Sequence, residues 1–193
     1  MSARGIALAA LTALSLGLGA CTMQALPGPT ATLDNIQALR AGGVAPMTVG
    51  SFTPGPGAPT EMDQSITVRA GIQPAPEGSF AKYLGDTIAA ELKGAGRFDP
   101  GSTLIVSGVV TNTHVDSGMP AGTAQAALGA HFTLMRAGKV VFDKTLSVDS
   151  TWDSNFIGAV AIPDAINHYT DLFQKLAGKL FSDPDFVAAA KGG

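Results

Sequence analysis

One short stretch of the chain places two carboxylates and a large aromatic ring close together in sequence. In SVDSTWDSNF, residues 147–156, Asp149 and Asp153 lie on either side of Trp152. Paired carboxylates in a cleft can act as general acid and base in hydrolysis. The favoured interpretation is simpler: Asp149 faces solvent at a strand end and Trp152 covers the start of the last long helix. We therefore predict no catalytic residue, and keep the two aspartates as those to test for a hydrolase.

The remaining reactive side chains form no recognisable motif. The three histidines, His114, His131 and His168, fall in different segments and none has a partner at metal-ligand spacing. No G-x-S-x-G elbow is present, and the glycines at 94 and 96 lack the rest of a dinucleotide-binding fingerprint. A helix end explains those glycines better. We expect no metal and no cofactor.

The single cysteine, Cys21, ends an apolar run. Arg4 is the only charge before Asp34, and residues 6–20 are all small or apolar. This pattern is typical of the n-region and h-region of a secretory signal peptide. The run is about 15 residues long, which is short of the roughly 20 that a membrane-spanning helix needs. An unpaired cysteine in an exported chain also requires an explanation of its own.

The residues Leu18-Gly19-Ala20-Cys21 resemble the lipobox of bacterial lipoproteins. The resemblance implies that residues 1–20 are a lipoprotein signal peptide and that Cys21 is lipidated and becomes the first mature residue. Two or more acyl chains hold a protein stably on a membrane. Thr22 stands where an aspartate would favour inner-membrane retention, so the resemblance implies outer-membrane anchoring facing the periplasm, with the inner membrane as the alternative.

The mature chain would be mildly acidic. Removing residues 1–20 leaves 173 residues with 11 basic and 15 acidic side chains, a net charge of −4. Nucleic-acid binding normally needs clustered Lys and Arg, and no such cluster occurs, so we expect no nucleic-acid partner. For the same reason we expect attachment to the membrane to depend on the acyl chains alone.

Pattern and turn residues divide the rest of the chain into elements. Residues 21–32 are small, polar and proline-containing, which predicts a flexible tether. Residues 33–193 are predicted to form a single domain. The expected helices are 33–41, 80–95 after the N-cap Ser79, 161–181 with Pro163 near its first position, and a short one from 184. The expected strands are 46–52, 65–70, 103–115, 124–136 and 140–148.

These elements predict an α+β fold. Alternating strands favour a mostly antiparallel sheet of about five strands, with two main helices packed on one face. The best hairpin signal joins the last two strands at Ala137-Gly138, where both strands place apolar residues on one face. Two loops, 53–63 and 116–122, are candidate contact surfaces, because loops on a rigid scaffold commonly carry binding.

The lipobox, the tether and the small α+β domain together resemble the small periplasm-facing lipoproteins of Gram-negative bacteria. These include uncharacterised families and, more distantly, LptE-like or transporter-auxiliary lipoproteins. The resemblance implies a noncatalytic, lipid-anchored accessory that binds an envelope protein or assembly, and it assigns a role to Cys21 alone. The alternatives are a self-assembling structural envelope lipoprotein, whose edge strands pair between copies as a homo-oligomer, and an envelope hydrolase.

Overall fold

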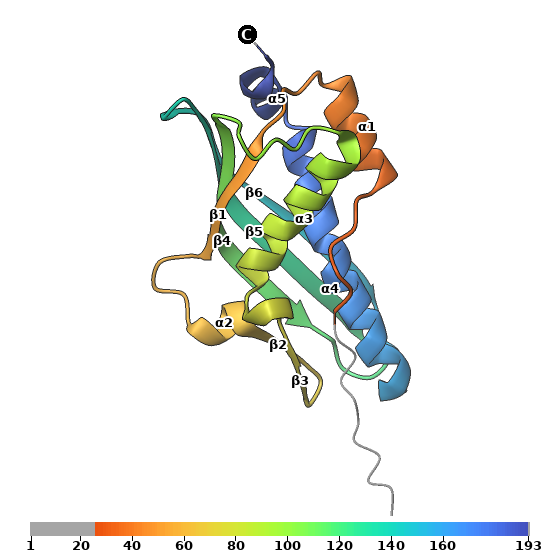
Figure 1. Ribbon diagram of the computed structural model, residues 1–193. Coiled ribbons are helices and arrows are strands. Elements are labelled where there is room, and N and C mark those ends of the chain that lie inside the picture. The colour runs from red at the N-terminus through yellow and green to blue at the C-terminus, as the bar shows by residue number, and fades with distance from the viewer. Residues whose placement is uncertain (1–25, 193) are drawn as a thin grey trace, which may run out of the picture.

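The computed structural model describes residues 26–192. The signal peptide and the lipidation site predicted at Cys21 therefore lie outside the described residues. Within them, a four-stranded sheet is covered on one face by helices (Figure 1).

The strands of this sheet follow the order β1-β4-β5-β6. Its members are β1 (Thr48–Pro54), β4 (Leu104–Asp116), β5 (Thr123–Arg136) and β6 (Lys139–Asp153). Strands β4, β5 and β6 form an antiparallel meander, whereas β1 runs parallel to β4. The turn at Ala137-Gly138 joins β5 to β6, which confirms the predicted hairpin. As a result β1 and β6 are the two edges of the sheet.

The α+β class is confirmed, and the expected single, mostly antiparallel sheet of about five strands is matched approximately, with two differences. Strand β1 pairs in parallel because the helical segment between β1 and β4 returns the chain to the same end of the sheet. The predicted strand at 65–70 is β2 (Ser65–Val68), which pairs with β3 (Gly71–Pro74) in a separate hairpin. Only four residues long, β2 turns at Arg69 with a positive φ of 57°.

Two long helices, α3 (Phe80–Ala95) and α4 (Gly158–Phe181), lie on one face of the sheet (Figure 1). The shorter ones are α1 (Leu33–Ala41), α2 (Thr60–Gln64), the 3₁₀ helix η1 (Pro76–Gly78) and α5 (Pro184–Ala190). Helix α3 begins as predicted, with the Ser79 side chain accepting a hydrogen bond from the Lys82 N–H, and ends at Gly96 in the left-handed conformation.

Helix α4 begins earlier than the sequence predicts. Pro163 was expected near the first helical position, but the helix starts at Gly158 and the proline lies inside it. The start is set by Ile157, whose carbonyl oxygen accepts hydrogen bonds from the N–H groups of Val160 and Ala161. The sequence predicts an apolar stripe on this helix that starts at Ile162 and Ile166 and continues through Tyr169, Phe173, Leu176 and Leu180. The last four are buried and the two isoleucines are partly buried. Near the helix start the fully buried positions are alanines.

Residues 26–32, predicted as part of the flexible tether, lie between α3 and α4. The Tyr83 hydroxyl donates to the Pro27 carbonyl at 2.9 Å, and the Gln174 side-chain amide donates to the Thr30 carbonyl at 3.1 Å. The fully buried Glu91 of α3 accepts hydrogen bonds from the Thr32 N–H, the Thr32 hydroxyl and the Asn35 amide. A buried carboxylate needs such donors, so this segment belongs to the folded body.

One hydrophobic core fills the space between the sheet and the helices. The predicted inward faces of β5 and α3 are confirmed as buried: Ala126, Leu128, Ala130, Phe132 and Leu134 on the strand, and Phe80, Leu84, Ile88, Leu92 and Ala95 on the helix. Aromatic rings from both long helices meet at right angles, as between Phe80 and Tyr169 with centroids 5.2 Å apart. The sheet and its helices thus form a rigid scaffold for the two edges and for the loops at its ends.

Candidate functional site

The structure does not bring the predicted carboxylates and the tryptophan together. Along β6, Asp149 and Asp153 are exposed and share the face turned away from the helices. They are four positions apart on the strand, which corresponds to about 13 Å between their Cα atoms. Trp152 points to the opposite, helix-covered face and packs against the core. These three residues therefore form no shared cleft, because side chains alternate along a strand.

Trp152 instead stacks on His168 of α4. The two rings are nearly parallel, with centroids 4.2 Å apart and planes 7° from one another. Nδ1 of His168 lies 3.0 Å from the Ser150 hydroxyl, while Nε2 lies 3.9 Å from Asp164. A catalytic relay needs every link within hydrogen-bond reach, and the link to Asp164 is too long. The cluster fixes the end of β6 against α4, which agrees with the prediction that Trp152 covers the start of the last long helix. The roles of His168 and Ser150 were not predicted, because the two residues come from different elements.

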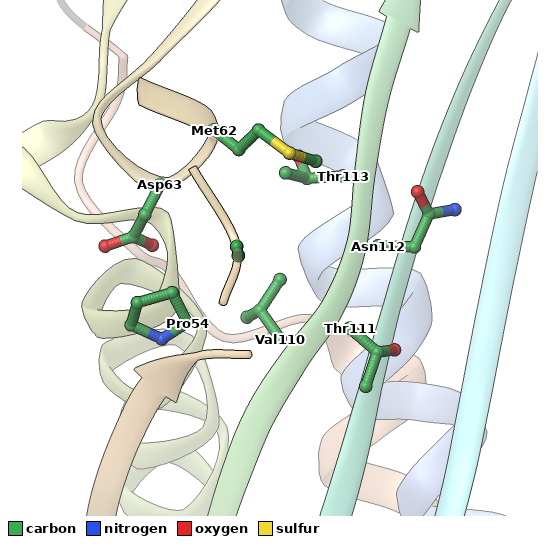
Figure 2. Close-up of a pocket in the computed structure, with 8 residues that line it drawn as sticks. Pro54, Met62, Asp63, Val110, Thr111, Asn112 and Thr113 are labelled. Carbon is green, nitrogen blue, oxygen red and sulfur yellow. The ribbon is translucent and has the colours of Figure 1, made fainter. Parts of the chain in front are cut away.

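The first candidate loop, 53–63, closes a small cavity between the end of β1, α2 and the irregular middle of β4 (Figure 2). Met62 reaches from α2 toward Thr113 of β4. The volume of the whole cavity is about 20 Å³, enough for one water molecule. Asp63 accepts a hydrogen bond from the Ala81 N–H at 2.8 Å, which secures the start of α3. This loop therefore supports the fold and leaves no room for an organic ligand in the cavity.

Beside this cavity, the buried Tyr169 hydroxyl hydrogen-bonds with the Thr113 hydroxyl. Burial raises the pKa of Tyr169 well above its ordinary value, and the bond to Thr113 only partly opposes that effect. The phenol is therefore neutral across the physiological range.

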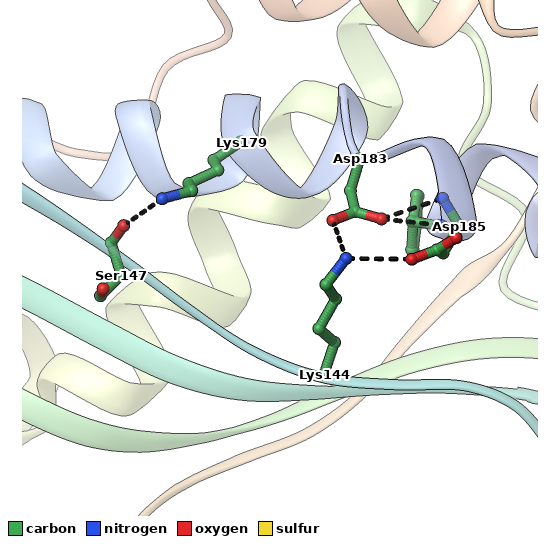
Figure 3. Close-up of polar contacts among 6 residues, drawn as sticks. Lys144, Ser147, Lys179, Asp183 and Asp185 are labelled. Carbon is green, nitrogen blue, oxygen red and sulfur yellow. Dashed lines mark hydrogen bonds and ion pairs between the residues drawn. The ribbon is translucent and has the colours of Figure 1, made fainter.

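The β6 edge of the sheet is protected by two lysines (Figure 3). Lys179 reaches down from α4 and donates from Nζ to the main-chain carbonyl of Ser147 at 2.7 Å. Lys144, on β6 itself, pairs with Asp183 at 2.8 Å and with Asp185 at 3.0 Å. Lysines on an edge strand hinder its pairing with another chain.

Asp183 also caps α5. Its side chain accepts hydrogen bonds from the N–H groups of Asp185 and Phe186. Burial alone would raise the pKa of Asp183, but the bonds from Lys144 and from the two N–H groups outweigh burial and hold this pKa below its ordinary value. The carboxylate thus ties β6 to the C-terminal helix.

The β1 edge has no comparable protection along Thr48–Pro54. In the described structure all residue pairings of β1 are with β4. Just before the strand, Met47 receives a hydrogen bond from the Asp99 N–H and donates to the Arg97 carbonyl, both at 2.9 Å. On this side the chain therefore forms one isolated β-bridge, between Met47 and Phe98, and this pairing does not continue along β1. A bulge between Val49 and Phe52 and the proline at position 54 limit further pairing to a short segment.

A groove of about 340 Å³ runs between β1 and α3 beside this edge. It is lined by Val49, Gly50, Phe52, Lys82, Gly85, Asp86, Ala89 and Phe98. Two glycines make room for Phe52: a Cβ on Gly85 would lie 2.9 Å from its ring, and a Cβ on Gly108 would lie 2.8 Å from its Cδ1. At the rim Lys82 pairs with Glu77 and Asp86, and these hydrogen bonds raise the pKa of Lys82. The groove is mainly apolar with one ionic rim.

The second candidate loop, 116–122, is tied to two other connections at one end of the molecule. Arg69, between β2 and β3, donates from its main-chain N–H to the Ser117 hydroxyl at 3.1 Å and from its guanidinium to the Ser154 hydroxyl at 2.9 Å. Ser154 in turn donates to the Ser117 carbonyl at 2.6 Å. We call the three connections, residues 69–72, 117–122 and 154–160, the loop end.

The histidines lie apart. His131 of β5 pairs with Asp143 at 3.1 Å on the uncovered face of the sheet, His114 is exposed on β4, and His168 is stacked on Trp152. Among residues 26–192, no three His, Cys, Asp or Glu side chains gather as metal ligands would. In the same part of the chain, no helix is both long enough and apolar enough to span a bilayer.

Comparison with known proteins gives similar structures only. No family model matches the chain, and no curated protein matches it in sequence. A Xanthomonas campestris protein of family DUF330 has a TM-score of 0.47 at 13% identity, over 72% of this chain and 84% of the other. A minor lipoprotein from Acinetobacter baumannii has a TM-score of 0.41 at 8% identity, over 74% and 91%. The PelC dodecamer from Paraburkholderia phytofirmans has a TM-score of 0.41 at 14% identity, over 86% and 96%.

Proposed function

We propose that this protein is a noncatalytic, lipid-anchored envelope protein that binds an extended segment of another envelope protein along β1. The observation that carries the proposal is the difference between the two sheet edges. Lysines from α4 and β6 protect the β6 edge, whereas the β1 edge is free and borders an apolar groove. Strand addition at a free edge takes affinity from main-chain hydrogen bonds and specificity from neighbouring pockets.

The groove favours a particular kind of segment. A strand added beside β1 would continue the pairing that the chain begins at Met47, and its inward side chains would contact Phe52, Phe98 and Ala89. The bulge at Val49 to Phe52 restricts the added strand to a few residues. We therefore propose a short, extended, apolar segment flanked by polar residues. Self-assembly is the second candidate, because two copies could pair through their β1 edges.

A noncatalytic role is supported by the geometry of the only carboxylates that sequence analysis offered for hydrolysis. Asp149 and Asp153 are about 13 Å apart on an exposed strand face, which exceeds the separation that acid and base catalysts of glycoside hydrolysis use. Replacing both by asparagine should leave the envelope phenotype of a complemented deletion strain unchanged. A loss of complementation with normal protein levels would revive the hydrolase alternative.

Photocrosslinking from the two edges tests the partner site. A photoreactive residue replaces Ser51 on β1 or, as the matched control, Ser147 on β6; both serines are exposed. In living cells, Ser51 should yield an adduct with an envelope protein and Ser147 should not. An adduct of twice the protein's own mass would favour self-assembly. Equal adducts from both positions, or none from Ser51, would contradict binding along β1.

Lipid anchoring is tested separately. A Cys21→Ala variant should lose incorporation of labelled fatty acid and leave the membrane fraction. Continued labelling of that variant would overturn the assignment of Cys21 as the lipidated residue. Fractionation of inner and outer membranes from cells with the unaltered protein then tests the proposed outer-membrane location.

A further inference from the structure

Exposed apolar side chains gather at the loop end. Each of its three connections contributes at least one such side chain. Two of these side chains are among the most exposed large hydrophobic residues in the described chain: Met119 at 78% and Phe156 at 75%. The others are Ile72, Ile157 and Val160. Single exposed hydrophobic residues are common on soluble proteins, but a group from three separate segments of the chain indicates a contact surface.

The loops hold these side chains in place. The Asp116 carboxylate accepts a hydrogen bond from the Gly118 N–H, and the Gly122 N–H donates to the Met119 carbonyl. Gly118 has φ of 69°, and a Cβ there would lie 2.6 Å from the Thr123 carbonyl oxygen, so the turn requires glycine. Together with the Arg69, Ser117 and Ser154 bonds, this turn presents Met119 outward from a fixed position.

The path of the N-terminal segment relates this surface to the membrane. From Thr32 back to Pro27 the chain passes from Glu91 to Tyr83, toward the start of α3. Tyr83 contacts Phe173, which lies fifteen residues, or about 22 Å, from the start of α4 at the loop end. Five residues from Leu26 to Cys21 reach at most about 18 Å. An acylated Cys21 therefore cannot hold the domain well clear of the bilayer.

We propose that the loop end lies on the bilayer that holds Cys21, with Met119, Phe156 and Ile157 at the boundary between headgroups and acyl chains. The proposal that a bilayer covers this surface rests on the lipid anchoring of Cys21 proposed above. The contact would be apolar, because the charges nearest the loops are mainly acidic, Asp116, Asp153 and Asp164, and Arg69 is engaged with Ser154 and Asn155. Attachment of the protein to the membrane therefore would not depend on the acyl chains alone. Because the contact is apolar, added salt should not weaken it.

Site-specific fluorescence tests this orientation. In the mature protein Cys21 is acylated, so an introduced cysteine is the only free thiol. Met119→Cys, and Val140→Cys as a control that is exposed and apolar but lies on the β5–β6 hairpin, each carry an environment-sensitive dye. The lipidated protein is placed in vesicles of phosphatidylethanolamine and phosphatidylglycerol with a spin-labelled quencher lipid. The dye at 119 should shift to the blue and be quenched at least twofold more than the dye at 140, in low and in high salt.

Two further variants separate the possible failures. Phe156→Asp with Ile157→Asp should abolish the quenching at 119 while circular dichroism stays unchanged. The mature chain with a hexahistidine tag in place of Cys21, held on nickel-chelating lipids, should show the same difference between positions 119 and 140. Equal quenching at both positions in either setting would overturn the orientation, whereas absence of acyl chains on the unaltered protein would overturn only the anchoring.

Discussion

The two edges of the four-stranded sheet differ in how their main chain is presented to other molecules. The β6 edge is the longer, and lysines from α4 and from β6 occupy it. The β1 edge is short and bulged, and it borders the groove under α3. A long edge strand left free invites nonspecific pairing, whereas a short free edge beside a shaped groove can select its partner. This difference is the reason for proposing that a partner binds at β1.

The groove depends on the ring of Phe52, and Gly108→Ala is expected to have the largest effect. A methyl group at position 108 would collide with Cε1 and Cδ1 of that ring. Overpacking of this kind costs about 1–3 kcal/mol of the free energy of unfolding. Urea denaturation measures the loss, and the Ser51 adduct should disappear as the ring moves. Gly28→Ala is the control, because a Cβ there meets no atom within 4 Å. Unchanged stability of Gly108→Ala would contradict the packing described for Phe52.

The second prediction concerns a lysine introduced on β1, which would protect this edge as lysines protect the β6 edge. Ser51→Lys should weaken partner binding at least tenfold, or about 1.4 kcal/mol, since a lysine on the edge hinders strand addition. Co-purification in mild detergent measures the binding. Ser147→Lys makes the same change on the edge that is already protected and should bind normally. If the two variants behave alike, the edges do not differ in function.

The third prediction concerns the support of the β6 edge. Asp183→Ala removes the cap of α5 and the partner of Lys144, and should destabilise the protein by about 1 kcal/mol. Asp183→Asn keeps a hydrogen-bond acceptor for the cap and should therefore lose less stability than Asp183→Ala.

The same carboxylate predicts a pH dependence. Its pKa in the folded protein is below its unfolded value, so its contribution is complete above about pH 4 and is lost as the pH falls through the folded pKa. Thermal unfolding from neutral to acid pH should show a smaller decline for Asp183→Asn than for the unaltered protein. Parallel declines would show that Asp183 is not held ionised by its partners.

The smallest effect is expected from removing protection at a single point. Lys179→Met frees the Ser147 carbonyl at the β6 edge and should cause weak self-association at high protein concentration. Lys175→Met is the matched control, since Lys175 is exposed one turn earlier on α4. Sedimentation velocity distinguishes the two variants. If the Lys179→Met protein is monomeric at every concentration, Lys144 and its partners are sufficient to protect the β6 edge from self-association.

Periodic segments of the chain could be predicted from sequence. Helix α3 has a cap at Ser79 and an apolar residue at every third or fourth position, and β5 has a buried apolar residue at every second position from Ala124 to Leu134. The start of α4 was misplaced because Pro163 is a strong local signal, while the actual start is set by hydrogen bonds around Ile157. Residues 26–32 look like a tether because the group that holds them, Glu91, is 59 residues away from Thr32.

The candidate site was harder to predict for the same reason. The protection of β6 comes from Lys179 acting on a carbonyl 32 residues earlier, and local pattern carries no information about such a contact. The pairing of β1 with β4 depends on the path of the chain through α3. One sequence-based prediction did fall on the loop end: residues 116–122 were expected to be a contact surface. That prediction rested only on the general tendency of loops to carry contacts.

Hydrogen exchange in the native envelope tests most directly whether β1 is the binding edge. Amide exchange of the full chain is measured by mass spectrometry in membrane vesicles from producing cells and again after purification. The account predicts that peptides covering Thr48–Pro54 exchange more slowly in the vesicles, while peptides from Lys139–Asp153 exchange at equal rates in both. Equal rates at β1, or slowing confined to β6, would contradict it.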